Sequence, residues 1–288
     1  MKTILVPIDF SDNSKNALDY AVEFAKKMNY EITLVHAFQP TLVEAINDSI
    51  KILKHQEITG TPQDIKAQLK LWQKAVIDID KNLDCNAIFI EGNLSDEINE
   101  IIEDNTIDLI IMGTKGATGL KSVFMGSNTA QVIETVLCPV LAIPSDYKFK
   151  DFKTIAFATD YHDNDKISLG FLTDLSEQFN SNLEVVHIAN NDMKSRYEED
   201  LLEYFVTQIK KTINYKKLNF HLIEGKDNIS KALNEFVVNH KVDLIAISTV
   251  DRILHGPLFN RGITKDMSHH IKVPLLAFHA YDEGDDLF

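Results

Sequence analysis

The residues of this chain best suited to chemistry are three glycines that follow a short apolar run, residues 108–112 (DLIIM). These glycines are Gly113, Gly116 and Gly126. Glycine has no Cβ atom and tolerates positive φ angles, so the backbone of such a loop can approach a ligand closely. Residues 129–137 (TAQVIETVL) then show helical periodicity, and a helix N-terminus attracts anions through its unpaired N–H groups and its dipole. With the hydroxyls of Ser127 and Thr129 beside it, the segment predicts a phosphate-binding loop.

The elements that must position this loop alternate between strand and helix. In the first half we expect strands at residues 3–9, 32–38, 87–91, 108–112 and 140–143. We expect helices at residues 13–28, 95–105 and 128–137, and a helical region within 41–82. Alternation of this kind predicts an α/β fold with a parallel sheet, and such sheets bind ligands at the carboxyl ends of their strands. Asp9, Ala37 and Gly113 all stand at such ends.

The second half of the chain repeats the first. Residues 3–9 (TILVPID) align with 154–160 (TIAFATD), and residues 108–111 (DLII) align with 243–246 (DLIA). A repeat of about 150 residues is the size of a whole domain, so it predicts a duplication. We expect one domain at residues 1–146, a second at 152–281, and an acidic tail at 282–288.

Composition narrows the classes of function. The 288 residues carry a formal net charge of −14 and are 44% hydrophobic. An acidic surface repels phosphate backbones, so we expect no binding to nucleic acid. No apolar run approaches the roughly 20 residues of a membrane span, and the N-terminus does not resemble a signal peptide. Two cysteines and scattered histidines suggest neither a disulfide framework nor a metal site, so we expect a cytoplasmic protein without a membrane partner.

Three motifs together resemble the universal stress protein family. They are residues 6–9 (VPID), the pattern G-x2-G-x9-G-S from Gly113 to Ser127, and residues 138–143 (CPVLAI). The resemblance covers residues 1–145. It implies a Rossmann-like fold of the adenine nucleotide alpha hydrolase type, with a five-stranded parallel sheet flanked by helices in each half.

The same resemblance implies a site for an adenine nucleotide, ATP or else ADP or AMP, with Mg²⁺ as an optional companion. Asp9 would contact the adenosine, the backbone of Ala37 the adenine, and the loop the ribose and phosphates. The residues implied are Pro7, Asp9, Ala37, Met112, Gly113, Gly116, Gly126, Ser127, Asn128 and Thr129. The alternative is structural: Asp9 would hold the next helix, the glycines would make turns, and Ser127 to Thr129 would cap a helix.

The second half departs from this pattern. Aligned on Asp108 and Asp243, the three glycines become Ser248, Asp251 and Arg261. The added Cβ atoms block a close approach of the backbone to phosphate, and the Asp251 carboxylate would repel it. We therefore expect that this half does not bind ATP, although Asp160 matches Asp9.

The sequence therefore predicts a tandem universal stress protein that binds one adenine nucleotide and has a regulatory or protective role in stress. It identifies no catalytic residue. Two alternatives stay open: a slow ATPase or phosphotransferase at the same site, and a structural module that binds no nucleotide. A protein partner is expected but not identified. The last strand of each half favours pairing with another strand, which would give either a pseudo-two-fold monomer or a homodimer.

Overall fold

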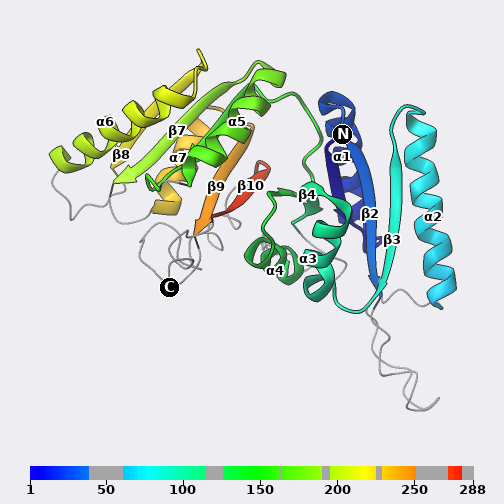
Figure 1. Ribbon diagram of the computed structural model, residues 1–288. Coiled ribbons are helices and arrows are strands. Elements are labelled where there is room, and N and C mark those ends of the chain that lie inside the picture. The colour runs from blue at the N-terminus through cyan, green and yellow to red at the C-terminus, as the bar shows by residue number, and fades with distance from the viewer. Residues whose placement is uncertain are drawn as a thin grey trace. The chain divides into compact units, whose positions relative to one another are not determined.

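The computed structural model describes residues 1–38, 61–114, 126–162, 164–189, 195–224, 229–250 and 272–280. Side chains are described in all of these except at residues 195, 196, 249, 250 and 280. The described residues divide into two compact units, the first ending at Phe149 and the second beginning at Lys150. Figure 1 shows both units and labels most of their elements.

The first unit is a parallel sheet with the strand order β3-β2-β1-β4-β5. Its strands are β1 (Thr3–Pro7), β2 (Glu31–Phe38), β3 (Cys85–Glu91), β4 (Ile107–Gly113) and β5 (Val140–Ile143). Its helices are α1 (Asp12–Met28), α2 (Pro62–Ile79), α3 (Leu94–Asn105) and α4 (Ser127–Thr135). The central strands read as continuous apolar runs and are buried along most of their length, as expected for a parallel sheet covered by helices on both faces.

The second unit repeats this arrangement with the order β8-β7-β6-β9-β10. Its strands are β6 (Thr154–Ala158), β7 (Asn182–Ala189), β8 (Leu218–Glu224), β9 (Leu244–Val250) and β10 (Leu275–Ala280). Its helices are α5 (Asp165–Phe179), α6 (Ser195–Thr212) and α7 (Ile229–Asn239). Figure 1 shows α2 running beside β3 and α6 beside β8, so the helix before the outer strand has the same place in both units. The expected α/β fold with a parallel sheet and flanking helices is confirmed.

Two elements end two residues earlier than the sequence predicts. The first strand ends at Pro7 rather than at residue 9, because the chain turns at Phe10, whose φ is 60°. The helix expected to reach residue 137 ends at Thr135, and Val136 is already extended. Pro139 follows three residues later, and a proline disfavours helical conformation in the residue before it.

The helical region expected within residues 41–82 contains α2, while residues 41–60 lie outside the described residues. Thr61 caps this helix: it accepts from the Asp64 N–H, and the Asp64 carboxylate accepts from the Thr61 N–H. This reciprocal pair is a capping box, and Pro62 occupies the first helical position, where a missing N–H costs nothing. Among the described helices, none combines the length and apolarity needed to cross a membrane.

Candidate functional site

The strand order places the candidate residues at one edge of the first sheet. The chain runs from β1 outward through β2 to β3, and then returns to β4 on the other side of β1. The carboxyl ends of β1 and β4 therefore form the switch point at which open α/β sheets bind ligands. Pro7 is level with Val35 on β2, and Leu5 is level with Ile110 on β4. Continued by a few residues, these registers bring Asp9, Ala37 and Gly113 to the same edge.

Asp9 is held in place by Ser11, which also starts the next helix. The Asp9 Oδ1 atom accepts from the Ser11 N–H at 3.0 Å and from the Ser11 hydroxyl at 2.6 Å. The Ser11 Oγ atom in turn accepts from the Ser14 N–H at 3.2 Å and so caps α1. The structural role of Asp9 is therefore present: through Ser11 the carboxylate stabilises the helix start, and it is half-buried at the edge of the sheet.

Phe10 and His36 lie next to the candidate residues, and the sequence did not single them out. Phe10 adopts a positive φ, which is uncommon for a bulky residue, and its ring lies 4.8 Å from the His36 ring and 5.3 Å from the Trp72 ring. His36 is buried, and its Nδ1 donates to the Ile8 carbonyl at 2.6 Å. Burial lowers the pKa of His36, while the bond to Ile8 and the charge of Asp9 oppose that shift. The signal in the sequence was the recurrence of this histidine as His187 in the second half.

The end of β4 and the start of α4 are tied together by hydrogen bonds. The Gly126 N–H donates to the Thr114 carbonyl at 2.6 Å, and the Thr114 N–H donates to the Ile143 carbonyl at 2.9 Å. The Thr129 hydroxyl donates to the Gly113 carbonyl at 2.8 Å and is buried. The two ends of the glycine loop are thereby fixed next to each other, although residues 115–125, which include Gly116, lie outside the described residues.

Helix α4 begins at this point without a side-chain cap. Its N-cap residue is Gly126, and within the described residues no side chain accepts from its first N–H groups. Ser127 and Asn128 are exposed, with the Ser127 hydroxyl 3.5 Å from the Asn128 Oδ1. The predicted alternative role of Ser127 to Thr129 as caps is therefore not the one these side chains adopt here. N–H groups at the start of a helix that have no side-chain cap can donate to an anion.

The remaining candidates lie in the strands that frame this edge. Pro7 ends β1 and is half-buried, whereas the Met112 side chain is buried in β4, level with Ala142. Ala37 lies near the end of β2, level with Ile90 of β3. Among the described residues, no group of three or more His, Cys, Asp or Glu side chains has a spacing that could hold a metal ion.

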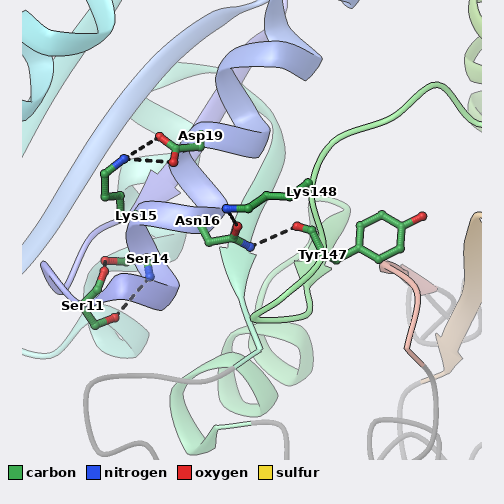
Figure 2. Close-up of polar contacts among 7 residues, drawn as sticks. All are labelled: Ser11, Ser14, Lys15, Asn16, Asp19, Tyr147 and Lys148. Atoms are coloured by element: carbon green, nitrogen blue, oxygen red, sulfur yellow. Dashed lines mark hydrogen bonds and ion pairs between the residues drawn. The ribbon is translucent and has the colours of Figure 1, made fainter.

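Helix α1 is fixed from its other side by the segment that follows β5. Figure 2 shows Asn16 of α1 between Tyr147 and Lys148. The Asn16 Nδ2 donates to the Pro144 and Tyr147 carbonyls at 3.3 and 3.1 Å, and its Oδ1 accepts from the Lys148 Nζ at 2.7 Å. Ser11 and Asn16 thus determine where α1 begins and how it lies against the end of the sheet.

Comparison with known proteins agrees with this geometry. The universal stress protein family matches residues 1–144. Universal stress protein YxiE of Bacillus subtilis is 29% identical over 143 residues, which are 49% of this chain and 97% of that protein. Universal stress protein MJ0531 of Methanocaldococcus jannaschii is 29% identical over 152 residues, 51% of this chain and 84% of that protein. The crystal structure of a universal stress protein from Archaeoglobus fulgidus has the same fold over 96% of this chain and 98% of its own, with a TM-score of 0.72 and 18% identity. The chain belongs to the universal stress protein family.

Proposed function

We propose that the first unit binds one adenine nucleotide, with ATP as the first candidate, and that this ligand serves a regulatory or protective role in the stress response. The observation that carries the proposal is the N-terminus of α4, which no side chain of the described residues caps and which Thr129 and Gly126 fix beside the end of β4. A phosphate group would accept from the N–H groups of Ser127, Asn128 and Thr129, and the helix dipole would stabilise its charge.

The adenosine part of the ligand would lie toward Asp9 and Ala37. Asp9 keeps one carboxylate oxygen bonded to Ser11, and its position is therefore set before any ligand arrives. A ribose hydroxyl could donate to the carboxylate, while the Ala37 backbone would meet the base. The Asp9 carboxylate already accepts hydrogen bonds from Ser11 and so supports the turn and the helix start. We therefore propose nucleotide binding as the main activity, and ATP hydrolysis is an outcome to be measured.

The proposal is tested with Gly126→Asp. Gly126 has φ −59° and ψ 152°, which any residue adopts, so an aspartate fits the backbone and caps α4. Its carboxylate would occupy the place of the phosphate and repel it, and we expect ATP affinity to fall by about tenfold or more. Titration calorimetry measures the affinity. Trp72, the single tryptophan of the chain, packs on Phe10 and supplies a second readout by fluorescence.

Gly170→Asp is the matched control, since it adds the same charge within α5 of the second unit. A Cβ atom at Gly170 meets no atom within 4 Å among the described residues, so the variant should fold and bind ATP like the wild type. Equal affinity in wild type and Gly126→Asp would refute the site. Phosphate release that is lost only in Gly126→Asp would instead identify the ATPase alternative.

A further inference from the structure

The second unit contains a buried acidic cluster that the proposed nucleotide site does not use. We define this cluster as Asp160, Asp165, His187 and Glu198. Asp160 follows β6, Asp165 begins α5, His187 lies in β7 and Glu198 lies in α6. Asp165 is fully buried, and the side chains of Asp160 and Glu198 are 9% and 6% exposed. Three carboxyl groups thus share a site from which water is largely excluded.

The contacts of His187 place one proton in this cluster. Its Nδ1 lies 2.7 Å from the Thr159 carbonyl oxygen, which can only accept, so Nδ1 carries a hydrogen. Its Nε2 lies 3.3 Å from the Glu198 Oε2. That oxygen is buried and has no hydrogen-bond partner among the described residues.

Asp160 adds a second place for a proton. Its Oδ1 is 3.8 Å from the His187 Nδ1, and its Oδ2 is buried with no hydrogen-bond partner among the described residues. Burial, together with the charges of Asp165 and Glu198, raises the pKa of Asp160 to about 8. Burial also raises the pKa of Asp165 to about 6, although a hydrogen bond from Thr159 and the charge of His162 act in the opposite direction.

Aromatic side chains cover the cluster. The Tyr161 ring stacks on the His187 ring with centroids 4.2 Å apart, and the Phe205 ring of α6 lies 5.0 Å from Tyr161. Burial raises the pKa of the Tyr161 hydroxyl, and the charges of Glu198 and Asp160 raise it further, so Tyr161 brings no additional negative charge. Tyr161 has a φ of 62°, and Phe10 at the matching position of the first unit has 60°.

The first unit has the same frame with one carboxyl group, that of Asp9, which matches Asp160. His36 bonds the Ile8 carbonyl as His187 bonds that of Thr159, but its ring neighbours are Phe10 and Phe89. The buried residues of α2, which corresponds to α6, are Ile65, Leu69 and Val76. The acidic cluster is therefore a property of the second unit and not of the shared fold.

We propose that the acidic cluster makes the second unit a pH-responsive element: protons shared among its side chains keep α6 and the turn after β6 packed, and their loss at alkaline pH loosens both. Among the described residues, the titratable groups that face the cluster in addition to its four members are Tyr161 and His162 of the turn after β6. The inference does not depend on nucleotide binding in the first unit.

The direction of the effect follows from the two aspartates. In the unfolded chain Asp160 loses its proton near its ordinary pKa of 3.8, whereas in the folded unit it keeps the proton up to about pH 8. The folded state thus binds more protons between these values, and its stability is lost as the pH rises through this window. Burial lowers the pKa of His187, which destabilises the folded state only on the acid side of about 6.5. Between pH 7 and 8 Asp160 therefore dominates.

Hydrogen exchange of α6 in the full chain tests the proposal. Corrected for intrinsic exchange rates, protection of residues 195–212 should fall by up to about tenfold per pH unit between pH 7 and 8, as expected for one proton. Asp160→Asn, which resembles the protonated acid, should keep its protection across this range. Asp174→Asn on the exposed face of α5 is the control with the same change of charge and should behave like the wild type.

Constant protection of wild-type α6 from pH 7 to 9 would overturn the proposal, as would a loss of protection in Asp160→Asn already at pH 7 in a folded protein. If Asp160→Asn does not fold, the wild-type protein provides the test. Its aspartate carboxyl carbons are labelled selectively with ¹³C, and their NMR signals are followed as a function of pH. One signal with a midpoint above pH 7 is expected, and midpoints that all lie below 6.5 would refute the proposal.

Discussion

Ser11 connects two features of the first unit that a sequence shows separately. Its hydroxyl donates to the Asp9 carboxylate and accepts from the Ser14 N–H, so one side chain positions the candidate ligand residue and caps α1. A serine before an amphipathic segment is a common helix start, so a cap at Ser11 is a feature that a sequence can indicate. The bond to Asp9 depends on the sharp turn at Phe10, which the sequence did not reveal.

Replacing Ser11 by alanine should have two measurable effects. The loss of a cap destabilises a helix by about 1 kcal/mol, and the same decrease is expected in the free energy of unfolding of the first unit. Release of Asp9 should also weaken ATP binding by several-fold, because the carboxylate would no longer be held in one orientation. Urea denaturation measures the first effect, and titration calorimetry measures the second.

Thr61→Ala is the matched control for Ser11→Ala. It removes the cap of α2 and should cost a similar free energy of about 1 kcal/mol, but Thr61 makes its hydrogen bonds with Asp64 and not with Asp9. Unchanged ATP affinity is therefore expected. If both variants weaken binding equally, general destabilisation and not the Ser11–Asp9 contact would explain the loss.

At the scale of elements, the sequence predicted the strands and helices of the first unit better than the contacts between them. Periodicity located the helix after the glycine loop, but it could not distinguish capping by Ser127 from binding through bare N–H groups, since both use the same residues. Likewise, His36 lies in a strand that the sequence predicted, yet its bond to Ile8 joins two strands and leaves no local pattern. The acidic cluster was missed for the same reason, because its members come from four separate elements.

Among the contacts between elements, those of Asn16 are expected to have the largest effect on the stability of the first unit. Asn16 is buried, and its partners lie about 130 residues away in the sequence. Asn16→Ala would leave two carbonyls and the Lys148 ammonium group without this partner, so we expect the first unit to lose about 1–3 kcal/mol of stability. Denaturant unfolding measures this change.

The neighbouring Lys15→Ala serves as the control for Asn16→Ala. Lys15 forms an exposed ion pair with Asp19 at 2.9 Å, visible in Figure 2, and such surface pairs contribute little. A change within about 0.5 kcal/mol is expected. A comparable loss in both variants would show that any substitution in this turn of α1 destabilises the helix, and that the bonds of Asn16 to the segment after β5 have no special weight.

At the scale of the whole molecule, the repeat in the sequence predicted two copies of one fold, and both units have the same strand order around β1 and β6. What differs is the chemistry at the carboxyl ends of the strands. In the first unit the Asp9 carboxylate accepts from Ser11, whereas the second unit encloses Asp160 with two further carboxyl groups. Duplication has preserved the positions of the aspartate and the histidine while their surroundings diverged.

This divergence predicts that ATP stabilises one unit only. At a free ATP concentration of about 100 times Kd, a ligand that binds only the folded state adds about 2.7 kcal/mol to stability. Hydrogen exchange should therefore slow in β1, β4 and α4 on addition of ATP, while α6 and β7 keep their exchange rates. Mass spectrometry of the denatured protein should detect no more than about one nucleotide per chain. Gly126→Asp should lose the protection in the first unit and leave the second unchanged. Equal slowing in both units, with about two nucleotides per chain, would show that the buried carboxyl groups of the second unit tolerate a nucleotide after all, and that the loss of its glycines has not abolished the site.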